Sequence, residues 1–371
     1  MHPSTPFLLA LSLVPKLGPV TARNLIAWCG GPREVFDAPR SKLLRIPGIG
    51  HKLVDNLNKK DLFIRADAIL KQCEGLDITV TSYIAPSYPD MLKPLYDAPL
   101  VLYTRGKVAY HAQPAIAIVG TRKATDDGKA LTAHFASYFA QRGINVVSGL
   151  AYGIDFQAHK AALKAGGIST AVLAHGLDMI YPGNHSQKAQ ELLERGGWIS
   201  EYPPGSKIDP GNFPARNRII AGLCRATVVI EAAEKGGALI TGRFAFDQNR
   251  EVYAVPGRLG DPFSKGCNAL IRDQVAKLVV SPEEVLIDLG LDENPQTETK
   301  TQQLDLEFPD LNLPLNPRES SILNFLSRGE SPMDGIAMNT NMSASELSAV
   351  LLGMEFRGLI RQMPGKRFKR L

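Results

Sequence analysis

Short apolar runs alternate with amphipathic stretches between about residues 80 and 290. The runs are rich in β-branched residues, and most are followed by a turn that contains glycine. This alternation predicts strands joined by helices, which form a parallel sheet with right-handed crossovers. The predicted strands are 115–119, 144–148, 168–174, 198–200, 227–231 and 251–255. The sequence therefore predicts an α/β domain over residues 79–290.

Two regions with other patterns flank this domain. Residues 1–78 are predicted to form short helices separated by Pro/Gly turns, and residues 315–371 restart a compact pattern. Residues 291–314 are acidic and polar, contain three prolines and have no periodicity. They are therefore predicted to be a linker.

The N-terminal region contains the pattern of a helix-hairpin-helix. The sequence IPGIG at residues 46–50 precedes a predicted helix over 51–57, and its glycines let amides at the helix start face a phosphate. Residues 14–20 are a degenerate copy in which Lys16 takes the first glycine position. Tandem hairpins of this kind hold the DNA backbone without reading sequence. A helical packing domain without DNA contact is the alternative.

The C-terminal region is predicted to form three helices and a hairpin. Capping signals at 316–319, 331–334 and 343–346 each predict a helix start. A basic hairpin over 359–371 completes the pattern of a winged helix, in which the third helix binds DNA. A surface for protein interaction or dimerisation is the alternative, because the outer side of that helix is poorly basic. Its apolar face is formed by Leu347, Val350, Leu351 and Met354.

The composition of the 371-residue chain is that of a globular protein, with 44% hydrophobic and 21% charged residues. This excludes global disorder, collagen and a coiled coil. The net charge of +5 is unevenly distributed: residues 1–80 carry 11 Lys+Arg against 7 Asp+Glu, and residues 357–371 carry 6 against none. Residues 291–314 carry 1 against 6. Basic ends of this kind favour a polyanion such as nucleic acid as partner.

The cysteines and the apolar runs indicate the cellular compartment in which the protein is expected. Cys29, Cys73, Cys224 and Cys267 are far apart and have no metal-ligand spacing, so we expect reduced, buried thiols and no metal. Residues 7–14 are apolar but lack the basic residues and cleavage site of a signal peptide. No run approaches the roughly 20 apolar residues that span a bilayer. We expect a cytoplasmic protein without membrane contact.

The first strand of the α/β domain ends in a turn suited to phosphate binding. Gly120-Thr121-Arg122 follows the strand, and a helix starts near Asp126. A glycine here lets a phosphate approach the helix N-terminus, where Arg122 can hold it through two hydrogen bonds. The turn is neither GxGxxG nor a P-loop, so no nucleotide cofactor is expected. A purely structural turn explains this single motif equally well.

Similar turns recur after the later strands. Because all strands of a parallel sheet end at one edge, these turns should meet there. Several glycine or hydroxyl turns at one edge suit a chain of phosphates better than a single one. Arg122, Arg216 and Arg218 are expected to supply positive charge, and aromatic rings to stack on unpaired bases. The rings are those of Tyr152, Tyr181 and Phe213.

At this point the motifs resemble those of a known family. They are GTR at 120–122, SGLAYGID at 148–155, GLDMIYP at 176–182, SEYPPG at 200–205, FPARNRIIAGL at 213–223, GGALIT at 236–241, AVPG at 254–257 and GCNALI at 266–271. In this order they resemble DNA-processing protein A, also called DprA or Smf. The resemblance implies an extended Rossmann-like domain between an N-terminal sterile-alpha-motif-like helical domain and a C-terminal winged helix.

The resemblance also implies a function. Members bind single-stranded DNA, form homodimers through the Rossmann domain and load the recombinase RecA, notably in natural transformation. The arginine of the GTR turn is a principal DNA contact, which corresponds to Arg122. The sequence has Gly183 and His185 where the family often has Lys and Asn, so Lys188 is the expected substitute. The predicted DNA-binding residues are Gly120, Thr121, Arg122, Ser148, Gly149, Gly153, Lys188, Phe213, Arg216, Asn217, Arg218, Gly236, Gly237 and Asn268.

Two enzyme classes are alternatives to a binding protein. A metal-dependent nuclease would need carboxylates that converge on shared ions, and Asp155, Asp178, Glu201 and Glu231 lie near the strand ends. A nucleotide phosphoribohydrolase is suggested by Glu231 with the nearby Lys-Gly-Gly, although the fuller PGGxGT loop is absent. His159 and His175 lack a nucleophile-elbow context and are expected to be structural. We therefore expect no catalytic residue.

Overall fold

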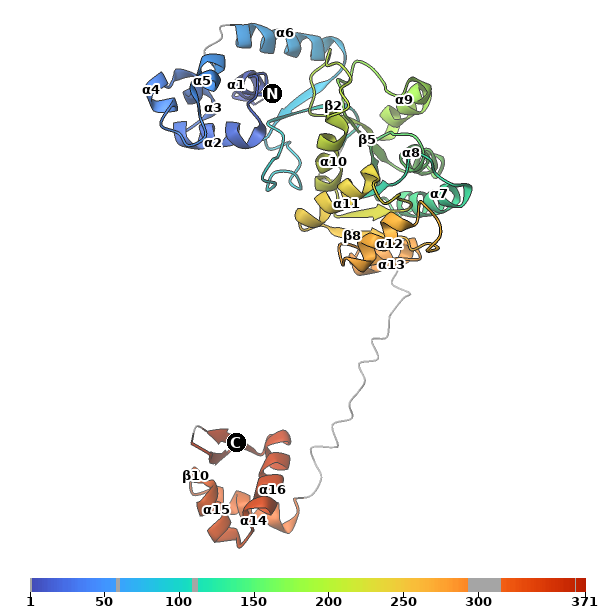
Figure 1. Cartoon of the computed structure of the whole chain (residues 1–371). Coiled ribbons are helices and arrows are strands. Elements are labelled where there is room, and N and C mark those ends of the chain that lie inside the picture. The colour runs from blue at the N-terminus through green and yellow to red at the C-terminus, as the bar shows by residue number, and fades with distance from the viewer. Residues whose placement is uncertain (1, 58–60, 109–112, 293–314, 364) are drawn as a thin grey trace. The chain divides into compact units, whose positions relative to one another are not determined.

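The computed structural model describes residues 2–57, 61–108, 113–292, 315–363 and 365–371 (Figure 1). The chain divides into two compact units, Met1–Asp292 and Glu293–Leu371. Most of the predicted linker, residues 293–314, lies outside the described residues. None of the described helices is long and apolar enough to cross a membrane.

One sheet, with nine strands in the part of the chain that the structure describes, organises the first unit. Its order is β1-β2-β6-β5-β4-β3-β7-β8-β9. The six predicted strands are confirmed as β3 to β8, and these pair in parallel together with β9. The two strands β1 and β2 were not predicted, and β2 pairs antiparallel with both β1 and β6, so the sheet is mixed at this edge. The strands are β1 Thr79–Ser82, β2 Val101–Gly106, β3 Ala115–Val119, β4 Asn145–Ser148, β5 Ser169–Leu173, β6 Gly197–Ser200, β7 Ala226–Val229, β8 Glu251–Ala254 and β9 Lys277–Leu278.

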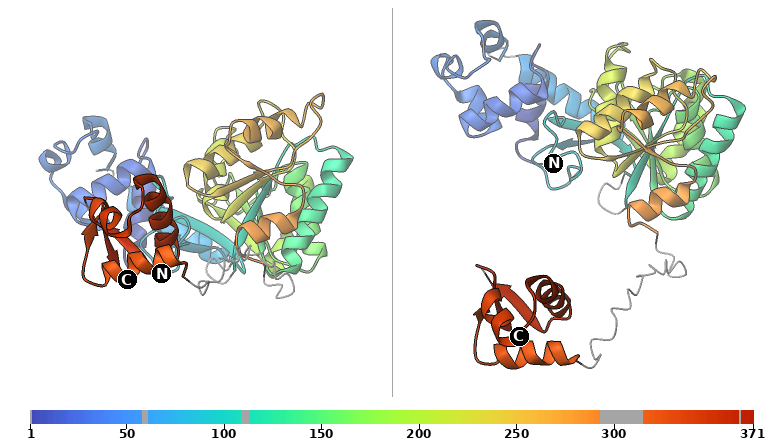
Figure 2. Two further views of the ribbon diagram at one scale, coloured as in Figure 1. Left: turned by 90° about the horizontal axis from the view of Figure 1, so that it is seen from below. Right: turned by 60° about the horizontal axis from the view of Figure 1, so that its bottom comes forward.

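Helices cover both faces of this sheet (Figure 2). Neighbouring strand residues point to opposite faces, so Ile116 and Ile118 join the core under α7 and α8, while Ala117 and Val119 join the core under α10 and α11. Both faces are therefore apolar, as the continuous apolar strands predict. The helices of this part are α7 Asp126–Gln141, α8 Ile154–Lys164, α9 Ser186–Arg195, α10 Asn212–Gly222, α11 Gly237–Asp247, α12 Lys265–Arg272 and α13 Pro282–Asp288, with the 3-10 turn η1 Gly183–His185.

Among the described residues, six helices precede the sheet, as predicted for this region. Gly48 in the turn before α5 has φ +81°, a backbone conformation that glycine adopts without strain. Lys16 has φ +66° in the degenerate copy of the motif, so this turn keeps the left-handed backbone without its glycine. The helices are α1 Thr5–Ser12, α2 Pro19–Cys29, α3 Pro32–Asp37, α4 Arg40–Leu43, α5 His51–Leu57 and α6 Asp61–Gly75.

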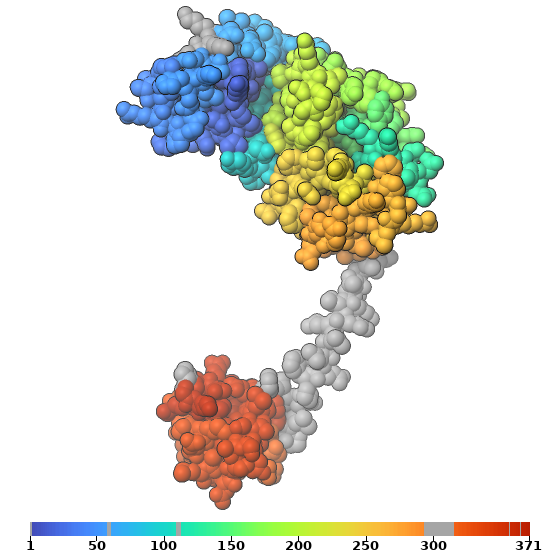
Figure 3. Space-filling view, viewed as in Figure 1, coloured from blue at the N-terminus to red at the C-terminus, as the bar shows by residue number. Residues whose placement is uncertain are grey.

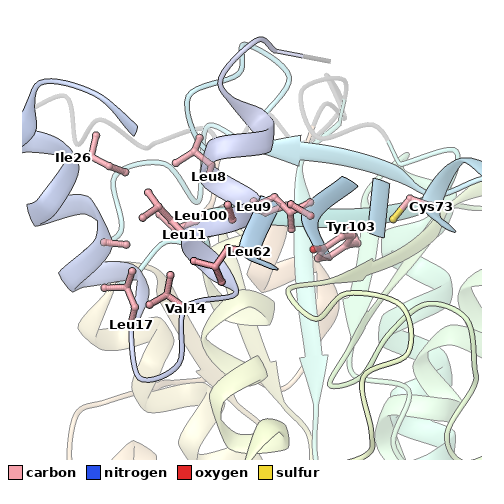
Figure 4. Packing of buried hydrophobic residues seen from close by; sticks show 14 of the residues in the cluster. Leu8, Leu9, Leu11, Val14, Leu17, Ile26, Leu62, Cys73, Leu100 and Tyr103 are labelled. Carbon is pink, nitrogen blue, oxygen red and sulfur yellow. The ribbon is translucent and has the colours of Figure 1, made fainter. Parts of the chain in front are cut away.

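The N-terminal helices and the sheet share one hydrophobic cluster. Leu8 and Leu9 of α1 belong to the same cluster as Tyr103 of β2, and Figure 4 shows these side chains together. The cluster continues to Trp198 of β6, so apolar burial joins the helices to the mixed edge of the sheet. In the space-filling view these helices lie directly against the rest of the unit (Figure 3).

The second unit is a winged helix with its own core. Asn316 with Glu319 and Ser343 with Glu346 form the predicted capping boxes. The cap predicted at Ser331 was wrong, because Ser331 pairs with Phe368 in a short strand and Pro332 is the N-cap of α15. Leu347, Leu351 and Met354 are buried in the core as predicted. The elements are α14 Pro317–Leu326, β10 Ser331–Pro332, α15 Met333–Thr340, α16 Ala344–Phe356, β11 Ile360–Met363 and β12 Arg367–Arg370.

Candidate nucleic-acid interface

A cleft of about 600 Å³ lies at the carboxyl ends of the central strands. Strand β3 has β4 on one side and β7 on the other, so the connections after β3 and β7 diverge at this point. Ligands of open α/β sheets bind where the strand order reverses in this way. The cleft is lined by residues of the turns after β3, β4 and β7, by α10, and by the start of α11.

Nine of the fourteen predicted residues line the cleft: Gly120, Thr121, Arg122, Gly149, Phe213, Arg216, Asn217, Gly236 and Gly237. Tyr152 and Tyr181, the other two predicted stacking residues, line it as well. Ser148, Gly153, Lys188, Arg218 and Asn268 are not part of its lining.

Arg122 and Phe213 meet in the cleft from different elements. The guanidinium carbon of Arg122 lies 5.8 Å from the centre of the Phe213 ring. Tyr181 also lies near this ring, with 5.9 Å between the two ring centres. Arg122 is exposed, so its charge remains accessible to a ligand. A cation beside an aromatic ring can contact a phosphate while the ring stacks on a base of the same nucleotide chain.

Close backbone approach explains the glycine at the end of β3. A Cβ at Gly120 would lie 2.4 Å from Cγ1 of Ile154 and 2.9 Å from the backbone oxygen of Glu231. Any larger residue would push the turn away from the start of α8 and from β7. Gly120 therefore holds the three chain segments together beneath Arg122.

Arg216 lies beneath the cleft and is buried. Its guanidinium donates hydrogen bonds to the backbone oxygens of Gly149, at 2.8 Å, and of Val172. Burial lowers the pKa of Arg216 to about 10, while the nearby Asp155 opposes this shift. Burial also raises the pKa of Asp155, against the effect of Arg216 and of the Gly149 amide that donates to it. Arg216 thus fixes the turn after β4, and most of its hydrogen-bonding capacity is used within the protein.

Arg218 lies away from the cleft and pairs with acids. Its Nη2 donates to both carboxylate oxygens of Glu201, at 2.6 and 2.7 Å, and its Nε lies 3.2 Å from Asp97. The side chain is only 9% exposed. Although Arg216 and Arg218 lie close in sequence, positions two apart on a helix face different directions.

The remaining three side chains outside the cleft also have partners within the protein. Ser148 donates to the backbone oxygen of Ile118, and Lys188 pairs with Glu191. The amide of Asn268 makes two hydrogen bonds to the backbone of Gly257. These contacts shape the surrounding turns.

At the start of α7, where the sequence predicts that a phosphate approaches, side chains of the protein accept the amides of Thr125 and Gly128. The Glu231 carboxylate accepts hydrogen bonds from the backbone N–H and the hydroxyl of Thr125, and that hydroxyl accepts the N–H of Gly128. A carboxylate of the protein therefore occupies the place of the expected phosphate. The start of α11 differs, because its N-cap is Gly236, which has no side chain to cap the helix.

Sequence reasoning missed the apolar rim of the cleft. Ile208 and Ile240 are each 39% exposed and line the cleft with Pro210. Ile208 and Pro210 lie between β6 and α10 in a segment without periodicity. Ile240 belongs to an apolar run that predicts burial. Its place at the rim of the cleft is therefore visible only from its exposure in the structure.

Three of the four acids proposed for a nuclease pair with groups of the protein. Asp155, Glu201 and Glu231 are hydrogen bonded to Gly149, Arg218 and Thr125 respectively. Among the residues that the structure describes, no group of three or more His, Cys, Asp or Glu side chains is arranged to hold a metal ion.

A doubly wound sheet with a cleft at its switch point, preceded by helices and followed by a winged helix, defines a Rossmann-type protein with two accessory modules. The family described as DNA recombination-mediator protein A matches residues 79–290, and the DprA winged helix domain matches residues 307–366. The chain belongs to this DprA/Smf family.

Individual relatives agree with this assignment. Protein Smf of Synechocystis is 33% identical over 98% of both chains. The structure of DNA processing protein A from Streptococcus pneumoniae is 32% identical, has a TM-score of 0.62, and covers 78% of this chain and 99% of its own. A structure of the Helicobacter pylori protein, described for its single-stranded DNA binding mode, is 29% identical, has a TM-score of 0.53, and covers 58% and 96%.

Proposed function

We propose that this protein binds single-stranded DNA in the cleft at the end of the sheet. The observation that carries the proposal is that Arg122 lies beside Phe213, which in turn lies beside Tyr181, in a cleft lined by several glycines. Arg122 and the amides at the start of α11 contact phosphates, and the rings stack on bases. The single-stranded DNA binding described for the Helicobacter pylori relative supports this proposal.

The exposed rings favour single strands over duplex DNA. Tyr152 and Tyr181 are each 44% exposed in the cleft, where they can stack only on bases that are not already paired and stacked. Contacts to phosphates and base faces carry little sequence information, so binding depends strongly on salt and weakly on sequence.

Recombinase loading is the second part of the proposal. The matched family is described as a recombination mediator, which supports delivery of the bound strand to RecA, as in natural transformation. The protein then acts in the cytoplasm as a binding protein without catalysis. The competing enzyme classes predict hydrolysis of nucleoside monophosphates, or magnesium-dependent cutting of single strands, by the purified protein.

A homodimer through the Rossmann domain completes the proposal. Strand β9 lies at the sheet edge and is followed by α13. Leu278, Val280 and Ile287 of this region are between 54% and 61% exposed. A self-complementary contact over such apolar side chains would let two clefts hold one strand and raise the effective affinity.

The flanking modules are proposed as accessories, with domain limits at residues 1–78, 79–290 and 315–371. In the winged helix, the structure favours the wing over α16 as the surface for a polyanion. Arg361 of β11 lies directly opposite Lys369 of β12, and both are exposed. Like charges in this position repel each other, and a bound anion relieves that repulsion.

The test of the proposal is a binding titration of the full chain with single-stranded and duplex DNA across a salt series. We expect a clear preference for single strands and a linear fall of log affinity with log salt concentration. Equal binding of both forms, or no binding to single strands, would contradict the proposal.

A further inference from the structure

Glu231, directly after β7, anchors both sides of the turn that carries Arg122. Its backbone oxygen accepts the N–H of Thr121 at 2.7 Å, and its carboxylate accepts the N–H of Thr125 at 3.0 Å. The same carboxylate accepts the Thr125 hydroxyl. One residue therefore fixes the backbone immediately before Arg122 and three residues after it.

The surrounding chain is shaped to admit this carboxylate. A Cβ at Gly128 would lie 2.3 Å from the carboxyl carbon of Glu231, so only glycine leaves it space. The carboxylate also lies at the first turn of α7, where the helix dipole favours a negative charge. Glu231 thus takes the position that an anionic ligand would otherwise occupy at this helix.

We propose that Glu231 is a positioning residue for DNA binding: it holds the turn after β3 so that Arg122 stays beside Phe213. This proposal rests on the function proposed above, because it assigns a role within that same cleft. A turn anchored at Thr121 and Thr125 loses less conformational entropy when the guanidinium meets a phosphate. Glu231 therefore strengthens DNA binding without touching DNA.

The sign of the effect distinguishes this role from simple electrostatics. Glu231 is an acid close to a site for a polyanion, and removing a carboxylate from such a site ordinarily tightens binding. If Glu231 positions Arg122, its removal must weaken binding instead. Asp127 provides a matched control, because it is an exposed carboxylate in the first turn of the same helix.

The experiment compares single-stranded DNA affinities of the full chain carrying Glu231→Ala, Glu231→Gln or Asp127→Asn at moderate salt. We expect Glu231→Ala to weaken binding about fivefold, which is the cost of losing a helix-capping interaction. Glu231→Gln keeps the shape of the side chain and one hydrogen-bond acceptor, so its affinity for DNA should lie closer to that of the wild type. Asp127→Asn should leave binding equal or slightly tighter. Tighter binding by both Glu231 variants would overturn the proposal.

A double variant tests whether the effect passes through Arg122. In the background of Arg122→Ala, the further change Glu231→Ala should cause no additional loss, because the side chain to be positioned is gone. A full fivefold loss in that background would show that Glu231 acts on the fold generally and would overturn the positioning role.

Amide hydrogen exchange of the DNA-free protein provides a readout that does not depend on binding. In Glu231→Ala, segment 120–128 should exchange about tenfold faster, while the strands of the sheet keep their protection. Unchanged exchange in this segment would overturn the proposal even if DNA binding is weakened. If the wild type fails to bind single strands, the proposed function is wrong. The exchange measurement then still decides whether Glu231 anchors the turn.

Discussion

Arg122 and Phe213 lie side by side in the lining of the cleft, with 5.8 Å between the guanidinium carbon and the ring centre. The arginine follows β3 and the phenylalanine lies in the first turn of α10, so the contact joins two segments that are far apart in the sequence. The contact places a positive charge for a phosphate and an aromatic surface for a base close enough together to bind the same nucleotide. The two contributions differ in their response to salt, and this makes them separable by experiment.

Arg122→Ala should weaken binding to single-stranded DNA about tenfold or more at moderate salt, because a charge-assisted phosphate contact is lost. The slope of log affinity against log salt should fall by about one, as expected for one phosphate contact fewer. Fluorescence anisotropy across a salt series measures both. Lys188→Ala is the control, since this cation lies outside the cleft lining and pairs with Glu191. Equal effects of the two variants would refute the assignment.

Phe213→Ala should weaken binding by about tenfold, in line with roughly 1–3 kcal/mol for the loss of one stacked base. The salt slope should stay unchanged, because no charge is removed. Phe246→Ala is the matched control: this phenylalanine of α11 is 51% exposed and does not line the cleft. A change in salt slope for Phe213→Ala would mean that the ring acts mainly by orienting Arg122.

Local patterns were sufficient to predict the central strands and the turns at their ends. The apolar runs are buried on both faces, and Gly120, Gly149 and Gly236 reach one cleft because parallel strands end at one edge. The antiparallel strand β2 was not predictable in this way. Its neighbour β6 follows it only after three further strands in the chain, and no turn signal links them.

The roles of the arginines depended on distant partners. The sequence pattern treats Arg216 and Arg218 alike, yet Arg216 binds the turn after β4 and Arg218 binds Glu201 and Asp97. Likewise, the occupation of the α7 start by Glu231 involves residues far apart in the sequence. Such contacts are set by tertiary packing, which neither propensity nor periodicity encodes.

Arg218→Met should affect stability more than DNA binding. The change leaves the carboxylate of Glu201 without its two hydrogen bonds, and burial already raises the pKa of Glu201 while Arg218 opposes this shift. Breaking such a pair costs about 3 kcal/mol of unfolding free energy. Urea denaturation measures the loss, and the double variant with Glu201→Gln should recover part of it. If Arg218→Met instead weakens DNA binding without lowering stability, Arg218 contacts DNA as the sequence predicts.

His159 should make the protein less stable in acid. It is buried; its Nδ1 lies 2.7 Å from the Ser169 hydroxyl, and its Nε2 has no hydrogen-bond partner among the described residues. Burial lowers the pKa of His159 from 6.5 to about 3. Between these values the unfolded chain binds the proton and the folded chain does not, so lowering the pH favours unfolding. Burial raises the pKa of Asp155, which opposes this trend.

The measurement is the free energy of unfolding in urea between about pH 7.5 and about pH 5, a range that includes the pKa of a free histidine. Below pH 6.5 the wild type should lose roughly 1 kcal/mol per pH unit through His159. His159→Gln cannot take up a proton, so its stability should depend less steeply on pH by that amount. His134→Gln, at an exposed position of α7, should keep the slope of the wild type. If His159→Gln also keeps that slope, the buried ring is not the source of the acid sensitivity.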